Sequence, residues 1–178
     1  TNINCLFILS AVFYKKNMLD ESSKVLSSIL LINANYIRSY INLGKILLRK
    51  KNYLMAIRKF KRALNLSDLF YNEINFFLFV AYLRTGLLNE AYKTAAKIDK
   101  NSPCYHKAMF NLTLVYYDQE LYDEANYTFN NIDSKYLDDF KYTKWKSRLS
   151  GITRDTQKLF VKKLIGYIPV IIISFSLV

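Results

Sequence analysis

The side chains that could take part in chemistry are few and widely separated. His106 is the single histidine among 178 residues, and the two cysteines, Cys5 and Cys104, lie far apart. A catalytic nucleophile needs a base within reach, and a zinc site needs several Cys or His at short spacing. Neither pattern is present, nor is a glycine-rich phosphate loop. We therefore predict no enzyme activity, no metal and no cofactor. We also predict that both cysteines are buried as small apolar side chains, and that His106 is a surface or capping residue.

Basic side chains outnumber acidic ones, with 26 Lys plus Arg against 14 Asp plus Glu and a formal net charge of +12. Such a balance favours nucleic acid, an anionic membrane surface or an acidic protein as a partner. The densest cluster is a candidate basic patch of Lys50, Lys51, Arg58, Lys59 and Arg62. It could meet anionic lipid or acidic protein, and the alternative is an ordinary solvated helix face. No nucleic-acid-binding signature accompanies it, so nucleic acid is not an expected partner.

The elements that carry these residues are helices that repeat along the chain. Gly (4) and Pro (2) are scarce, which disfavours a sheet-rich fold with many tight turns. Small residues recur at a nearly constant spacing in the second helix of each unit: Ser22, Ala56, Ala91 and Ala125. We expect Gly44 and Ala56 at a helix crossing, where slim side chains admit a close neighbour. Phe60 and Phe129 would fill the space beyond such crossings.

This order of residue types, with that spacing, resembles the tetratricopeptide repeat, whose period is about 34 residues. The resemblance covers residues 3–138 and implies an all-α fold, a right-handed α-solenoid of helix-turn-helix repeats. The four repeats would span about 3–36, 37–71, 72–105 and 106–138, followed by a capping or linker helix over 139–160. Phe79 stands where Gly44 stands one repeat earlier, so we expect a wider third helix pair. The alternative is another bundle of amphipathic helices, which would not predict so regular a period.

The last residues form a predicted hydrophobic tail, 161–178. From residue 164 onward there is no charge, and Lys158, Lys162 and Lys163 precede this stretch. That pattern is typical of a membrane anchor with its basic flank on the cytoplasmic side. Fifteen helical residues reach about 22 Å, which is short of a bilayer core of about 30 Å. The alternatives are a helix packed on the repeats and a strand in a larger assembly. Because the sequence begins with Thr1, we expect a fragment or a processed form.

The family resemblance further implies a concave groove, lined by the first helix of each repeat, for a peptide or helix of a partner. Placing the sequence on that pattern assigns to this groove Phe7, Ile41, Lys45, Phe76, Val80, Phe110, Leu114 and Tyr117. Most of these are apolar, which suits an amphipathic helix. The basic residues with which some family members hold acidic tails are absent, since Phe7 and Glu73 occupy two of their positions.

We therefore predict a membrane-associated scaffold or adaptor whose repeats lie on the cytoplasmic side and bind a partner protein. The first alternative is a structural subunit of a large membrane complex, covered by neighbouring subunits and without an exchangeable ligand. The second is a soluble regulator that holds its own hydrophobic tail in the groove.

Overall fold

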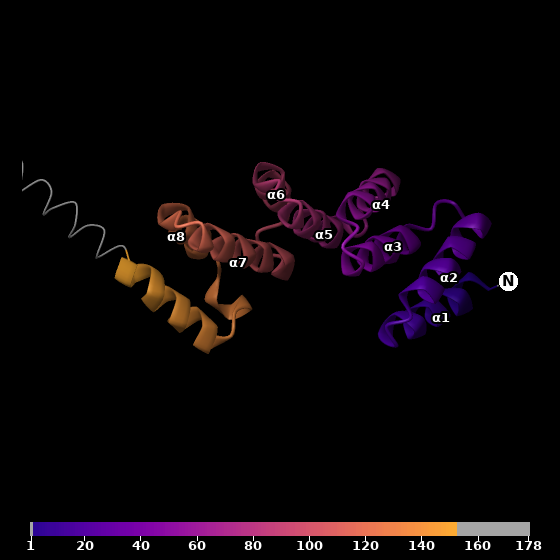
Figure 1. The fold of residues 1–178 in the computed structure, drawn as a ribbon, viewed down its shortest axis with the longest axis horizontal. Coiled ribbons are helices and arrows are strands. Elements are labelled where there is room, and N and C mark those ends of the chain that lie inside the picture. Colours follow the sequence, from indigo (N-terminus) through magenta and orange to yellow (C-terminus); the bar gives the residue numbers. More distant parts are fainter. Residues whose placement is uncertain (1, 153–178) are drawn as a thin grey trace, which may run out of the picture. The chain divides into compact units, whose positions relative to one another are not determined.

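A computed structural model of the chain describes residues 2–152, which are helical and contain no strand. The chain divides into two compact units, residues 1–108 and 109–178. The helices are α1 (Ile3–Lys15), α2 (Leu19–Ile32), α3 (Ile37–Arg49), α4 (Tyr53–Leu66), α5 (Tyr71–Arg84), α6 (Leu88–Ala95), α7 (Pro103–Asp118) and α8 (Tyr122–Asn130), then the 3-10 helix η1 (Ser134–Tyr136) (Figure 1). Residues 139–152 form one more helix. The predicted tail, 161–178, lies outside the described residues.

The two helices of each pair are joined by the same kind of turn. One residue in each turn has a left-handed backbone conformation, with φ between 59° and 76°: Asn17, Lys51, Gly86 and Glu120. In the turn after α3, the Asn52 N–H donates to the Leu47 carbonyl at 2.8 Å. Such a backward bond satisfies a carbonyl that the helix end would leave unpaired. The turns recur once in each predicted repeat, and they confirm the predicted all-α array of helix-turn-helix pairs.

In the second helix pair, α3 and α4 approach each other closely at a glycine. A Cβ atom built on Gly44 of α3 would lie 2.4 Å from the Phe60 ring of α4. Side chains do not pack so closely, so only glycine leaves room for this ring. Phe60 and Ala56 are both fully buried, as are Ala91 and Ala125 in the later pairs.

The third pair exchanges large and small side chains between its two helices. Phe79 of α5 stands where Gly44 stands in α3, and Ala95 of α6 stands where Phe60 stands in α4; Phe79 and Ala95 are both fully buried. The large side chain therefore comes from the first helix instead of the second. The wider third helix pair expected from Phe79 stays a prediction.

Two predictions about burial are wrong. Cys5 is exposed and Cys104 is half-buried. Cys5 lies on the side of α1 opposite to Ile3 and Phe7, which pack against α2 and α3. His106 was expected to be a surface or capping residue but is buried, and its ring lies edge-on to Tyr105 with centroids 5.4 Å apart. The reason is helical spacing, because His106 lies on the buried side of α7.

Candidate functional site

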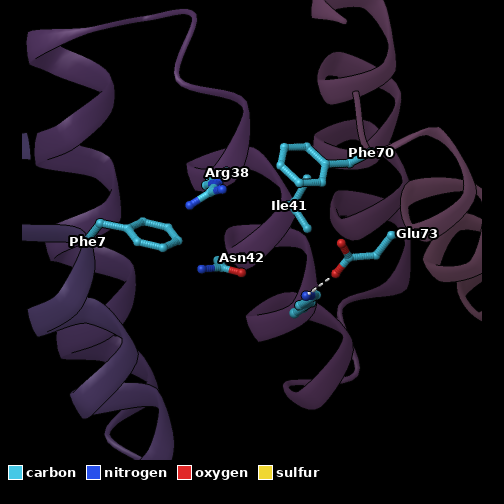
Figure 2. Close-up of a pocket in the computed structure, with 7 residues that line it drawn as sticks. Phe7, Arg38, Ile41, Asn42, Phe70 and Glu73 are labelled. Carbon is cyan, nitrogen blue, oxygen red and sulfur yellow. Dashed lines mark hydrogen bonds and ion pairs between the residues drawn. The ribbon is translucent and has the colours of Figure 1, made fainter. Parts of the chain in front are cut away.

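The first unit contains a cleft of about 180 Å³ between α1, α3 and α5. Figure 2 shows its lining residues, which are Phe7, Arg38, Ile41, Asn42, Lys45, Phe70 and Glu73. Four of them come from α3 at spacings of three, four and seven positions, which place them on one side of that helix. Phe7 of α1 forms one wall, while Phe70 and Glu73 at the start of α5 form the other.

Arg38 is held between two aromatic rings at the edge of this cleft. Its guanidinium carbon lies 6.0 Å from the ring centroid of Phe7 and 5.5 Å from that of Phe70. A cation near a ring face is stabilised by roughly 0.5–1 kcal/mol at exposed sites. No carboxylate of residues 2–152 forms an ion pair with Arg38. Its N–H donors therefore remain available for an acceptor oxygen from outside the chain.

Lys45, two turns further along α3, is already paired. Its Nζ atom lies 2.6 Å from Oε1 of Glu73 and 4.6 Å from the ring centroid of Phe77. Both partners are partly exposed, so solvent screening limits what this pair adds to stability. The pair connects α3 to α5 at one end of the cleft (Figure 2). Asn42, between Arg38 and Lys45, has no hydrogen-bond partner for its amide within the described part of the chain, so it remains available with Arg38.

Only part of the predicted groove comes together in this cleft. Phe7, Ile41 and Lys45 line it, and Ile41 is buried. Phe76 and Val80 of α5 are half-buried and are not among the cleft residues.

The other three predicted groove residues, Phe110, Leu114 and Tyr117, belong to the second unit and are half-buried. Trp145 of the helix over 139–152 lies edge-on to Phe110 and Tyr117, with centroids 6.1 and 5.1 Å away. Nε of Arg148 donates a hydrogen bond to the Tyr117 hydroxyl at 2.7 Å. In the second unit, Phe110 and Tyr117 are therefore covered by the chain's own helix over 139–152.

Sequence reasoning did not identify Arg38, Asn42 or Phe70 as lining residues. The family pattern gives groove positions at one-turn intervals, and the side chains between them are not part of it. Arg38 and Asn42 lie three positions before Ile41 and Lys45 respectively, so tracing the full helix face would have included them. Phe70 lies in the connection before α5, where helical periodicity does not apply.

The predicted basic patch is divided between a turn and α4. Lys50 forms an ion pair with Asp20 of α2. The hydrogen bond from Lys50, with its positive charge, lowers the pKa of the Asp20 carboxyl. Nζ of Lys59 lies 5.7 Å from the ring centroid of Tyr40. Three patch residues are exposed without an ion pair in the described region: Lys51, Arg58 and Arg62.

No protein-family model and no curated protein matches the sequence. Several solved structures match the fold. A crystal structure of MamA aligns with a TM-score of 0.65 and 19% identity, over 83% of this chain and 81% of that chain. PilF of Pseudomonas aeruginosa aligns with a TM-score of 0.62 and 14% identity, over 83% of this chain and 67% of that chain. Both are tetratricopeptide-repeat proteins. This chain has the tetratricopeptide-repeat fold. At these identities the similarity concerns the fold alone.

Between residues 2 and 152, no helix has the length and apolar character that a bilayer crossing requires. Within that range, His, Cys, Asp and Glu side chains form no group of three that could hold a metal ion. The predicted membrane segment lies outside this range.

Proposed function

We propose that this protein is a scaffold or adaptor that holds a segment of another protein in the cleft between α1, α3 and α5. The observation that supports this most directly is Arg38, which lies between Phe7 and Phe70 and has no carboxylate partner among the described residues. A guanidinium group presents a fork of N–H donors that matches a carboxylate. An acidic side chain of the partner would pair with Arg38 and Asn42, and a neighbouring apolar side chain would rest against the phenylalanine rings.

The dimensions of the cleft favour a peptide or helix as the ligand. Its volume of about 180 Å³ is below the roughly 300–1000 Å³ of pockets that enclose small molecules. It can accept one or two side chains, so the rest of the contact must spread along the surfaces of the helices. The net charge of +12 favours the approach of an acidic segment.

Membrane tethering is part of the same proposal and rests on the sequence. The charge-free residues 164–178 follow Lys158, Lys162 and Lys163, a pattern that places a basic flank at the cytoplasmic surface. The tail would keep the partner at the membrane, and the repeats would lie on the cytoplasmic side.

Site-specific photocrosslinking in native membranes tests the cleft. A photoreactive phenylalanine analogue would replace Phe7 or Phe70, and the control position is Leu54, which is exposed on α4. We expect both cleft positions to crosslink the same protein, as identified by mass spectrometry, and Leu54 not to do so. Arg38→Glu should abolish these crosslinks. Crosslinks that persist in the Arg38→Glu variant, or that form equally from Leu54, would contradict the proposal.

A further inference from the structure

The first unit contains a second and larger hollow, the pocket at Asn75, which lies between α4, α5 and α6. Its volume is about 570 Å³, which falls within the roughly 300–1000 Å³ of pockets that enclose small molecules. None of the residues that line it belongs to the cleft at Arg38. The pocket is therefore a separate site, and its size suits a different kind of ligand.

The buried part of this pocket comes mainly from α5. Asn75, Leu78 and Tyr82 are spaced by three, four and seven positions, so they lie on one side of that helix. They are 2%, 4% and 8% exposed, respectively. Leu64 of α4 and the half-turn after α6 at Ala96 add further apolar surface. An apolar ligand body could be held here away from water.

Asn75 brings an unused hydrogen-bonding atom into this apolar part. Its Nδ2 atom donates to the Tyr71 carbonyl at 2.9 Å, whereas its Oδ1 atom has no hydrogen-bond partner among residues 2–152. Buried polar atoms are nearly always paired, because an unpaired one costs free energy. The Oδ1 atom therefore calls for a donor from outside the chain. A ligand that carries an N–H or O–H group on its body would supply that donor.

The exposed part of the pocket is strongly basic. Lys61 of α4 and Lys97 after α6 line it and form no ion pair in the described part of the chain. Lys93 of α6 also lines it and is paired with Glu90 across 3.5 Å, with both side chains exposed. Three positive charges and one negative charge leave the pocket with a net charge of +2. An anion is therefore the ligand that this charge favours.

We propose that the pocket at Asn75 binds a small phosphate monoester. Such a group carries about −1.5 to −2 charges at pH 7, which matches the net charge of +2 in the pocket. A carboxylate would neutralise only half of that charge. The phosphate lies among the lysines, the organic body rests against Leu64, Leu78 and Tyr82, and a donor on the body pairs with Asn75. This binding activity goes beyond the proposed scaffold function and uses none of the residues of the cleft.

Two probes of nearly equal shape test the charge match. At about pH 7.5, 4-hydroxyphenyl phosphate carries about two negative charges and 4-hydroxyphenyl sulfate carries about one. Ligand-observed NMR titration of the full 178-residue chain in detergent measures both dissociation constants. We expect about 1 mM or lower for the phosphate and a value at least about tenfold higher for the sulfate. Equal affinities, or no binding of the phosphate at about 10 mM, would overturn the proposal.

A matched pair of charge reversals tests the lysines. Lys97→Glu removes the net positive charge of the pocket and should weaken binding of 4-hydroxyphenyl phosphate at least about tenfold. The control is Lys24→Glu, which makes the same change at an exposed lysine of α2 that does not line the pocket. It should alter the dissociation constant less than about twofold at physiological salt, where distant charges are screened. Equal effects would mean that the probe follows the total charge of the chain, and would overturn the proposal.

Filling the hollow separates binding inside the pocket from binding on its surface. Ala96 lines the pocket and is itself exposed, so Ala96→Trp can occupy the space without removing a buried side chain. This variant should lose binding of the phosphate probe. Ala34→Trp, at an exposed alanine between α2 and α3, is the control and should keep it. Full affinity in Ala96→Trp, with an unchanged circular-dichroism spectrum, would overturn the proposal.

A phosphorylated protein could present the same chemistry, because phosphotyrosine ends in an aryl phosphate. A short phosphotyrosine peptide is therefore titrated beside 4-hydroxyphenyl phosphate. We expect the peptide to bind more weakly, since its chain continues beyond the ring and does not fit a pocket of small-molecule size. Tighter binding of the peptide would overturn the assignment of this pocket to a small molecule.

Discussion

Gly44 and Phe60 show how two residues determine the distance between the helices of one pair. The Phe60 ring occupies the space where a side chain at position 44 would begin. In the third pair, Phe79 and Ala95 carry the large and small side chains in the opposite order. In the second pair, the close approach of α3 and α4 needs a small residue at position 44, because the Phe60 ring fills the adjoining space.

Gly44→Ala should lower the free energy of unfolding by about 1–3 kcal/mol, because the new methyl group would displace the Phe60 ring. The higher helix propensity of alanine relative to glycine offsets only about 1 kcal/mol of the cost of this overlap. Urea denaturation followed by circular dichroism measures the change. In a Phe60→Leu background, Gly44→Ala should lower the free energy of unfolding by less, since the smaller leucine leaves room for the new methyl group. An equal cost in both backgrounds would show that the ring is not the cause.

Lys51, in the turn after α3, has a left-handed backbone conformation with φ of 59°. A residue with a Cβ atom in this conformation costs about 1–2 kcal/mol, whereas the extra chain entropy of glycine costs about 0.5–1 kcal/mol. Lys51→Gly should therefore raise the free energy of unfolding by about 0.5–1 kcal/mol. Lys51→Ala is the matched control, because it removes the same charge and keeps the Cβ atom. Equal denaturation midpoints for the two variants would count against the strain argument.

At the scale of the helices, the helix over 139–152 packs on the second unit chiefly through aromatic side chains. Tyr142 stacks on Phe129, and Trp145 lies across Phe110 and Tyr117. Leu149, on the same helix, is fully buried. The remaining residues of this helix are mostly exposed and polar, as a terminal element of a repeat array should be.

Trp145→Ala should destabilise the second unit by about 2–4 kcal/mol, because it leaves Phe110 and Tyr117 uncovered. Ser147→Ala, an exposed position on the same helix, is the control and should change the stability little. Urea denaturation monitored by far-ultraviolet circular dichroism compares the two. Similar urea midpoints for Trp145→Ala and Ser147→Ala would mean that Trp145 does not anchor this helix.

The ion pair between Lys50 and Asp20 joins the turn after α3 to α2, and its effect should depend on pH. Lys50 lowers the pKa of the Asp20 carboxyl in the folded chain. This pair therefore adds stability above the unfolded-state pKa of about 3.9. That stability disappears as the pH falls through the lowered pKa. Asp20→Asn should lower the urea midpoint at about pH 6 and have little effect at about pH 2. An equal effect of Asp20→Asn at both pH values would contradict this role of the ion pair.

At the scale of the whole molecule, the proposal combines a partner-binding array with attachment to a membrane. The described residues contain the cleft at Arg38. The proposed attachment would depend on the apolar segment that follows Lys163. These activities should be separable, because they use different residues.

Removing residues 160–178 should move the protein from the membrane pellet to the supernatant after alkaline carbonate extraction, since the charge-free segment would be lost. The described helices end before this deletion, so the circular-dichroism spectrum should keep its helical character. Arg38→Glu is the control that should leave membrane partition unchanged. If the truncated and intact chains partition alike, the membrane-tethering prediction is wrong.

The sequence by itself determined the helical array. Ser22, Ala56, Ala91 and Ala125 predicted the period, and the left-handed turns at Asn17, Lys51, Gly86 and Glu120 recur at the same spacing. Local periodicity is readable from sequence because each helix pair repeats one packing solution over a short stretch of chain.

Only the tertiary structure decided which side chains are free and which are covered. It placed Phe70 beside Arg38 and paired Lys45 with Glu73. It also placed Trp145 over Phe110 and Tyr117. These contacts join residues on different helices, and a helical period specifies the side of a helix on which a residue lies but not the neighbour that covers it.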